Sequence, residues 1–163
     1  MYKLGEEKTI VLSSNVKEKF EKYRNCLPKK ESGGILLGRI CLNDFIVIED
    51  ITEPSLKDKA GLLFFKRDKK TAQQVINERW ESSQGEIIYL GEWHTHNERF
   101  PTPSSVDRKM IKDLLLESKM EIDFLITIII GMKSNFVGIQ TSKGLTPLNF
   151  SNNPFIYEIP SDL

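Results

Sequence analysis

The sequence is poor in several features that would assign it to a specialised class of protein. Its two cysteines, Cys26 and Cys41, are too few for a disulfide framework. The first residues, MYKLGEEKTIVLSS, lack the basic region, long apolar run and small-residue cleavage site of a secretory leader. We therefore expect a cytoplasmic protein in which both thiols are reduced and buried.

Long hydrophobic runs and an excess of one charge are also absent. The longest apolar run, 124–130, is far shorter than the roughly 20 residues of a membrane-spanning helix, so we expect it to be a buried strand. Lys plus Arg and Asp plus Glu each total 23 residues, which leaves no net field to attract nucleic acid or anionic lipid. We expect neither a nucleic-acid partner nor a membrane.

What remains is the composition of an ordinary globular domain. The 163 residues are 39% hydrophobic and 28% charged, enough for a core and for a well-solvated surface. Internal repeats and low-complexity tracts are missing from the sequence. We therefore expect a single domain over residues 1–163.

Helical spacing of apolar residues predicts three helices, at 15–27, 68–83 and 105–119. Asn15 and Glu18 resemble a capping box at the start of the first helix. The apolar residues of the two later helices are expected to be buried: Ala72, Val75, Ile76, Trp80, Met110, Leu114 and Leu115.

Apolar runs between turn signals predict strands at 33–40, 45–51, 62–65, 87–93, 122–131 and 136–141. The first two form a hairpin that turns at Asn43 and Asp44. Residues 53–60 are expected to be an exposed loop, and the end of the chain a short extended tail. These elements predict an α/β (α+β) domain in which helices pack on one sheet.

The two histidines of the chain, His94 and His96, lie one residue apart at the end of a predicted strand. Alternate side chains of a strand share a face, about 6 to 7 Å apart, so both imidazoles can bind one ion. Asp107, at the start of a predicted helix, could fold back as a third ligand. Two nitrogens and one oxygen suit zinc and leave a fourth position for water.

A structural interpretation of these residues stands beside the metal site. A His-x-His pair on a strand often has no metal, and Ser104 and Asp107 have the spacing of a helix capping box. Capping does not exclude ligation, because a helix N-terminus lowers the pKa of a carboxyl group and keeps it ionised for a metal.

The full pattern resembles a known family signature. GEWHTH at 91–96, followed by Ser104 and Asp107, has the order and spacing of the JAMM (MPN+) metalloproteases, and Glu31 with the strand GGILLG at 33–38 resembles the upstream element. The similarity extends from about Glu31 to Ile130. It implies a JAB/MPN-like fold, a twisted and mostly antiparallel sheet flanked by helices, with the site at the sheet edge.

The resemblance also implies the chemistry of a zinc-dependent isopeptidase. His94, His96 and Asp107 would bind Zn²⁺, which lowers the pKa of bound water from 15.7 to about 7. Glu31 would be the general base that takes the water proton and returns it to the leaving amine. Ser104 would donate its hydroxyl to the oxyanion.

Three nearby residues qualify this assignment. On an ideal strand Glu92 shares the face of His94, so local spacing favours it as a base, whereas the family pattern favours Glu31. Asn97 stands where the family commonly has proline, and this departure puts the loop geometry in doubt. Trp93 is interpreted as a core residue and not as a wall of the substrate channel.

The short chain resembles bacterial members, in particular the deconjugating peptidases of CBASS anti-phage operons. The resemblance implies a protein partner with an extended C-terminal tail, either ubiquitin-like or a conjugated nucleotidyltransferase. Two alternatives stay open: a hydrolase that trims a sulfur-carrier protein, and a non-catalytic MPN scaffold that binds partner proteins.

Overall fold

The structure is a computed structural model that describes residues 9–25, 31–42, 45–61, 65–150 and 156–158. Its helices are α1 (Ser14–Asn25), α2 (Lys69–Ser82) and α3 (Ser105–Glu117). All three predicted helices are therefore present. No helix in the described ranges is long and apolar enough to cross a membrane.

The start of α1 is set by a different residue from those the pattern indicates. The hydroxyl of Ser13, and not Asn15 with Glu18, caps α1 by accepting the amide of Val16 at 3.3 Å. The side chain of Asn15 instead donates to Asp50 at 3.2 Å. The predicted end of this helix at residue 27 lies outside the described residues, as does Cys26. Cys41 is a half-buried free thiol.

Most strands belong to one sheet in the order β10-β11-β1-β3-β2-β6-β7-β8-β9. Their bounds are β1 Thr9–Leu12, β2 Gly33–Ile40, β3 Phe45–Ile51, β6 Ile88–Thr95, β7 Leu125–Ile130, β8 Asn135–Thr141, β9 Gly144–Pro147, β10 Asn149–Phe150 and β11 Ile156–Glu158. Neighbours pair antiparallel, except that β1 and β3, and β6 and β7, are parallel. The expected α+β class and mostly antiparallel sheet are confirmed.

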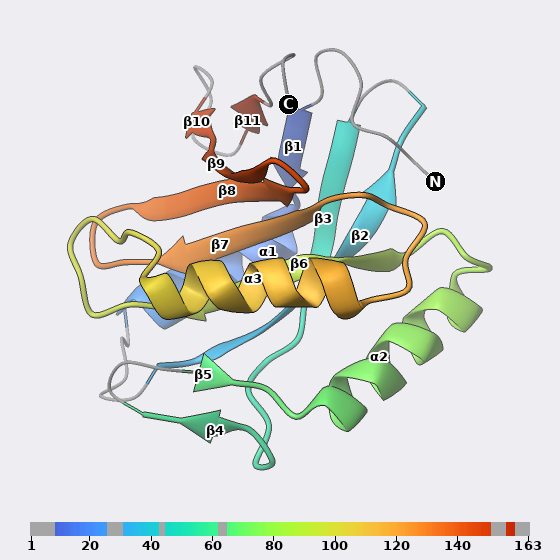
Figure 1. The fold of residues 1–163 in the computed structure, drawn as a ribbon, viewed down its shortest axis with the longest axis horizontal. Helices are drawn as coiled ribbons and strands as arrows, with labels where there is room; N and C mark the ends of the chain where they lie inside the picture. The colour runs from blue at the N-terminus through green and yellow to red at the C-terminus, as the bar shows by residue number, and fades with distance from the viewer. Residues whose placement is uncertain (1–8, 26–30, 43–44, 62–64, 151–155, 159–163) are drawn as a thin grey trace.

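Helices cover both faces of this sheet (Figure 1). On one face α1 buries Val16 and Phe20 in the larger hydrophobic cluster. On the other face α2 and α3 bury Ala72 and Ile111 in a second cluster. Successive residues of β2 alternate between the clusters, with Leu36 in the first and Leu37 in the second, as the period of a strand requires.

Several details differ from the sequence predictions. Trp80 is 54% exposed, whereas Ile111 is the apolar residue of α3 that is fully buried. The segment expected to be an exposed loop contains β4 (Lys59–Ala60), which pairs with β5 (Phe65–Lys66) as a separate hairpin. The expected strand at 62–65 lies mostly outside the described residues.

The described residues near the end of the chain form strands, where an extended tail was expected. β9 extends the sheet beside β8, and β11 pairs with β1; the sequence pattern predicted none of these three strands. The pairing of Thr9 with Glu158 joins residues from the two ends of the chain. Such short strands owe their conformation to these distant partners more than to their own composition.

A β-bulge in the central strand β6 decides which side chains reach the site. Leu36 pairs with Gly91 but Leu37 pairs with Tyr89, so β6 has one extra residue at this point. Gly91 has φ of 150°, and a Cβ there would lie 1.8 Å from the carbonyl oxygen of Ile126. Glycine is therefore required for β7 to pair closely at the bulge.

The extra residue lies between Tyr89 and Gly91, so the alternation of side chains along β6 shifts by one residue there. As a result Tyr89, Glu92 and His94 all point to the face covered by α2 and α3. Trp93 points to the opposite face, where it contacts the rings of Phe20 and Tyr23 at centroid distances of 5.6 and 4.7 Å. The interpretation of Trp93 as a core residue is confirmed.

Candidate metal centre

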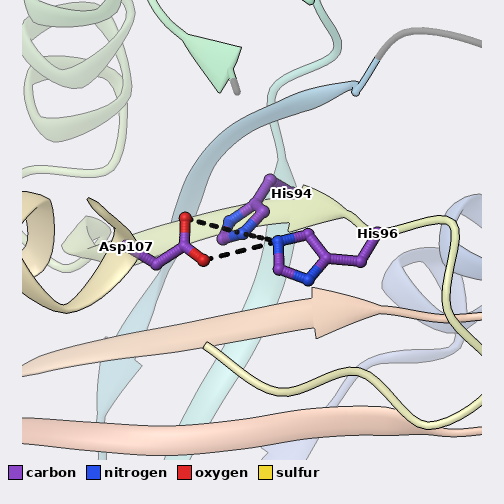
Figure 2. A group of neighbouring side chains, drawn as sticks. All are labelled: His94, His96 and Asp107. Carbon is purple, nitrogen blue, oxygen red and sulfur yellow. Dashed lines mark hydrogen bonds and ion pairs between the residues drawn. The ribbon is translucent and has the colours of Figure 1, made fainter. Parts of the chain in front are cut away.

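Three side chains from two elements converge at the C-terminal end of β6 (Figure 2). His94 is the second-last residue of β6, where it pairs with Gly33 of β2 and Ile129 of β7. His96 follows the strand, and its amide donates to the carbonyl of Ile130 at 2.9 Å. Asp107 reaches them from the first turn of α3.

The distances between the candidate donor atoms fit one zinc ion. His94 Nε2 lies 3.1 Å from His96 Nε2. The Asp107 carboxylate oxygens lie 3.3 Å from His94 Nε2 and 3.4 Å from His96 Nε2. Ligand atoms placed tetrahedrally at about 2.0 to 2.1 Å from zinc are about 3.3 to 3.4 Å apart. Each histidine faces a different oxygen of Asp107 at about this separation, and one ligand atom from each residue lies within 4.8 Å of the others, so the group is compact enough to hold one zinc ion.

The position of the site differs from the expectation of a sheet edge. β6 lies inside the sheet, with β2 on one side and β7 on the other. The candidate ligands lie at the end of this central strand, where His96 leaves the sheet and α3 begins nearby. Because both neighbours of β6 are filled, no substrate strand can pair with the ligand strand itself.

Asp107 is both a candidate ligand and part of a helix cap. Its carboxylate accepts from the amide and the hydroxyl of Ser104 at 2.7 Å each, and its amide donates to the Ser104 hydroxyl at 3.2 Å. Burial would raise the pKa of Asp107, but hydrogen bonds from His94 and His96, the charge of His94 and the Ser104 hydroxyl hold it well below its usual range. The capping box and an ionised ligand are thus compatible, as expected.

Glu31 approaches the histidines from the segment before β2. Its amide donates to the carbonyl of Gly61 at 2.8 Å, and its side chain is buried. One carboxylate oxygen lies 3.9 Å from His96 Nε2. Burial raises the pKa of Glu31 to about 7, although the charge of His96 opposes this shift. A carboxyl group with a pKa near neutrality beside the donor set can exchange protons at physiological pH.

Glu92 shares the face of His94, as local spacing predicts, but its carboxylate is engaged elsewhere. Arg67 Nε donates to its two oxygens at 2.7 and 3.0 Å, and the Tyr89 hydroxyl donates at 2.6 Å. Burial raises the pKa of Glu92, while Arg67 and Tyr89 oppose the rise. This buried ion pair favours a structural role over that of a base.

Arg67 is the residue near the site that the sequence does not single out. It lies between β5 and the N-cap of α2, Asp68, so its pair with Glu92 attaches this segment to the ligand strand. A buried carboxylate in mid-strand demands a cationic partner, but the pattern cannot say which of the many basic residues supplies it.

A pocket of about 90 Å³ opens beside His94 and Asp107, lined by Lys66 and Arg67 on one side and by Met110 and Leu114 of α3 on the other. A larger hollow of about 430 Å³ continues from it between α2 and α3 and shares Arg67, Lys69 and Leu114 with the first pocket. The site is therefore accessible along a partly apolar groove.

The loop that connects His96 to α3 is held by the β7–β8 turn. The amides of Met132 and Lys133 donate to the carbonyls of Glu98 and Arg99 at 2.7 and 3.0 Å. Pro101 is buried against Gly131, where an added Cβ would lie only 2.4 Å from the proline ring. The absence of proline at Asn97 is thus offset by contacts farther along the loop.

Comparison with known proteins agrees with this arrangement. Residues 13–142 match the family of prokaryotic homologues of the JAB domain. A protein of Escherichia coli named CD-NTase/cGAS isopeptidase is 35% identical over 85% of this chain and 86% of its own length. Proteins with the same name from Pseudomonas aeruginosa and Vibrio cholerae are 33% and 32% identical, covering 70% and 71% of this chain and 71% of their own length in each case.

A solved structure shows the same fold. The solution structure of a protein from Desulfitobacterium hafniense superposes with a TM-score of 0.57 at 21% identity, covering 85% of this chain and 88% of that one. The resemblance drawn from His94, His96, Ser104 and Asp107 is thereby confirmed at the level of the family. The chain belongs to the prokaryotic JAB family.

Proposed function

We propose that the protein is a zinc-dependent isopeptidase that removes a conjugated protein from its target. The observation that carries this proposal is the convergence of His94, His96 and Asp107, whose facing atoms lie 3.1 to 3.4 Å apart, with the buried carboxyl of Glu31 beside them. Two imidazoles and one carboxylate with an open fourth position are the donor set of catalytic zinc sites.

In this proposal His94, His96 and Asp107 hold the metal through the atoms that already face one another. When bound, zinc would act as a Lewis acid and lower the pKa of water to about 7. The hydrogen bonds from Ser104 keep the Asp107 carboxylate ionised and fix its orientation. The chain therefore supplies a ligand set that needs little rearrangement.

Glu31 is the proposed general base. It takes a proton from the attacking water and gives it to the leaving amine, so the peptide or isopeptide bond breaks with no net change in the protonation of the enzyme. Its pKa of about 7 suits both halves of this exchange. Glu31 Oε1 lies 3.9 Å from His96 Nε2, whereas the carboxylate of Glu92 is paired with Arg67.

Ser104 is the proposed oxyanion donor. Its side chain is exposed at the start of α3, next to the candidate ligand Asp107. Its hydroxyl donates a hydrogen bond to the Asp107 carboxylate at 2.7 Å. We propose that it turns to the developing oxyanion of the substrate, where a hydrogen bond is worth more because the charge is forming.

The names of the relatives support a substrate class. Proteins 32 to 35% identical to this chain are named CD-NTase/cGAS isopeptidases. We propose that this protein likewise releases a conjugated nucleotidyltransferase, as part of a cytoplasmic CBASS-like anti-phage system. A ubiquitin-like conjugate is the second candidate, because it offers the same extended C-terminal tail next to the bond.

Strand edges near the site support a route for the tail. β6 has both neighbours, but β5 pairs only with β4 within the described residues. β5 ends at Lys66, which lines the pocket beside His94. We propose that the tail lies between β5 and α3, where it can add backbone hydrogen bonds to β5 and bury apolar side chains against Met110 and Leu114.

The test is cleavage of defined conjugates. A nucleotidyltransferase fused through its C-terminal tail to a lysine side chain should be cut at the junction, and a chelator should stop the reaction. A ubiquitin-like conjugate and a sulfur-carrier protein with a C-terminal extension serve as competitors. Zinc binding without cleavage of any of the three would favour the scaffold alternative and contradict an isopeptidase.

A further inference from the structure

One polar atom at the candidate metal centre is buried without a partner. Nδ1 of His96 is inaccessible to solvent and makes no hydrogen bond in the part of the chain that the structure describes. The opposite ring nitrogen, Nε2, faces His94 and Asp107. A buried polar atom left unpaired costs about 1 to 3 kcal/mol, so a partner for Nδ1 is to be expected in the working protein.

The orientation of the ring decides what that partner must be. With Nε2 directed at the metal position, Nδ1 must carry the ring proton and can only donate. Histidine ligands almost always donate this second N–H to a carboxylate, a backbone carbonyl or water, which fixes the tautomer and raises the basicity of the ligand. His96 therefore needs an acceptor on its Nδ1 side.

Glu98 is placed to be that acceptor. Its carboxylate Oε2 lies 3.9 Å from His96 Nδ1, about 1 Å beyond hydrogen-bond distance. Its backbone is fixed, because its carbonyl accepts the amide of Met132 at 2.7 Å. Its side chain is 53% exposed, and its Oε2 accepts a long 3.3 Å hydrogen bond from the amide of Thr102. The carboxylate can thus move while the backbone keeps it beside the ring.

We propose that Glu98 is a positioning residue that accepts the Nδ1–H of His96 and so orients this ligand toward the metal. Glu98 does not touch the substrate or the metal in this proposal; it acts through His96. The inference rests on the proposed metal site. It assigns a role to a residue in the loop after the His-x-His pair, where this chain has no proline at Asn97.

The experiment measures zinc affinity and the hydrogen bond separately. Wild type, Glu98→Ala, Glu98→Gln and the control Glu86→Ala are titrated with zinc by competition with a chromogenic chelator. Glu86 is also a solvent-exposed carboxylate, 64% against 53% for Glu98. It pairs with Arg39 and lies just before β6, at the end of the strand opposite the histidines. The Hδ1 and Nδ1 resonances of His96 are recorded by ¹⁵N NMR on each zinc-loaded protein.

Removing the acceptor should weaken zinc binding by about 10- to 100-fold in Glu98→Ala and shift the His96 Hδ1 resonance upfield. Glu98→Gln keeps an acceptor oxygen and should recover part of the affinity and of the shift. Glu86→Ala should match the wild type. The melting temperature of metal-free Glu98→Gln should be unchanged, which separates ligand positioning from damage to the loop.

Three results would overturn the inference. Wild-type zinc affinity and an unshifted His96 signal in Glu98→Ala would show that Glu98 is not the partner of Nδ1. Equal losses of affinity in the alanine and glutamine variants, with an unshifted signal, would assign the effect to charge alone. Failure of the wild-type protein to bind zinc would refute the proposed function first, and the role of Glu98 with it.

Discussion

The three candidate ligands are each oriented by contacts outside the metal position. His94 is paired on both sides within the sheet, the His96 amide is bonded to Ile130, and the Asp107 carboxylate accepts two hydrogen bonds from Ser104. Because these contacts hold His94 and His96 by their backbone and Asp107 by its carboxylate, changing one side chain should remove a donor without displacing the others.

We therefore expect His94→Ala, His96→Ala and Asp107→Ala each to lose zinc and activity together. Asp107→Ala should also cost about 1 kcal/mol of stability, since the carboxylate half of the capping box is lost. Zinc content by elemental analysis and thermal unfolding measure the two effects. A full complement of zinc in the Asp107 variant would show that this residue is not a ligand.

The roles of the two buried glutamates can be separated by the same isosteric change. Glu31→Gln keeps the shape of the side chain but cannot accept a proton, so zinc should stay bound while single-turnover cleavage falls by about 100-fold or more. Glu92→Gln should leave more activity but destabilise the fold, because it leaves the buried guanidinium of Arg67 without its counter-charge.

Both variants are assayed on the same conjugate, with zinc content and urea unfolding measured beside the rate. A nearly normal Glu31→Gln enzyme next to an inactive but stable Glu92→Gln enzyme would reverse the assignment. The base would then come from the ligand strand itself, and the ion pair with Arg67 would have to open during the reaction.

At the scale of single elements, Ser104 at the start of α3 has two roles: it caps the helix, and it is the proposed oxyanion donor. Ser104→Ala should lower the rate by about 100- to 1000-fold through loss of the oxyanion donor. It should also cost about 1 kcal/mol through loss of the cap. Ser104→Thr, which keeps the hydroxyl and the cap, is the control. A normal rate in a folded alanine variant would leave Ser104 as a cap only.

The β-bulge of β6 leads to a prediction about stability. Gly91→Ala should destabilise the protein strongly, because the added Cβ would collide with the carbonyl of Ile126. Gly144→Ala is the matched control, since Gly144 also has a positive φ, of 136°, but nothing lies within 4 Å of an added Cβ. The control should cost only the backbone strain, on the order of 1 to 3 kcal/mol. Equal unfolding free energies for the two variants would contradict the close pairing at the bulge.

The elements also show what sequence reasoning can and cannot reach. Strong local signals, such as the helical stripe of α1 and the apolar run of β7, predict their elements correctly. β1 and β11 escape prediction because each is short and pairs with a partner from the other end of the chain. The exposed Trp80 shows that an apolar residue at helical spacing need not face the core.

The candidate site also has residues that the sequence predicts and contacts that it does not. His94, His96, Ser104 and Asp107 are close in the sequence, and their meeting follows from one strand, one loop and one helix start. The ion pair of Arg67 with Glu92 is not visible from the sequence, since it joins segments 25 residues apart and has no motif. Nor does spacing reveal the bulge that puts Glu92 and Tyr89 on the same face.

At the scale of the whole molecule, the fold should not depend on the metal. In the part of the chain that the structure describes, two hydrophobic clusters on opposite faces of a nine-stranded sheet supply the core without it. Removing zinc with a chelator should therefore leave the far-ultraviolet circular dichroism spectrum and a cooperative thermal transition in place, unlike in a zinc finger. Collapse of the transition on chelation would assign the metal a structural role instead.

The proposed route of the substrate tail along β5 leads to a prediction about cleavage. A tail that adds to the free edge of β5 donates backbone hydrogen bonds, so proline in the residues before the scissile bond should block cleavage. Alanine at the same positions is the control. Cleavage of the proline-bearing conjugate at the rate of the alanine-bearing one would exclude strand-like docking.

A zinc-dependent isopeptidase is tested most directly by whether cleavage of a nucleotidyltransferase conjugate requires the metal. We expect the purified protein to contain about one zinc per chain and to cut the conjugate. Chelation should abolish the cut, and added zinc should restore it in the wild type but not in His94→Ala. Full cleavage by a protein shown to be metal-free would contradict a zinc-dependent isopeptidase.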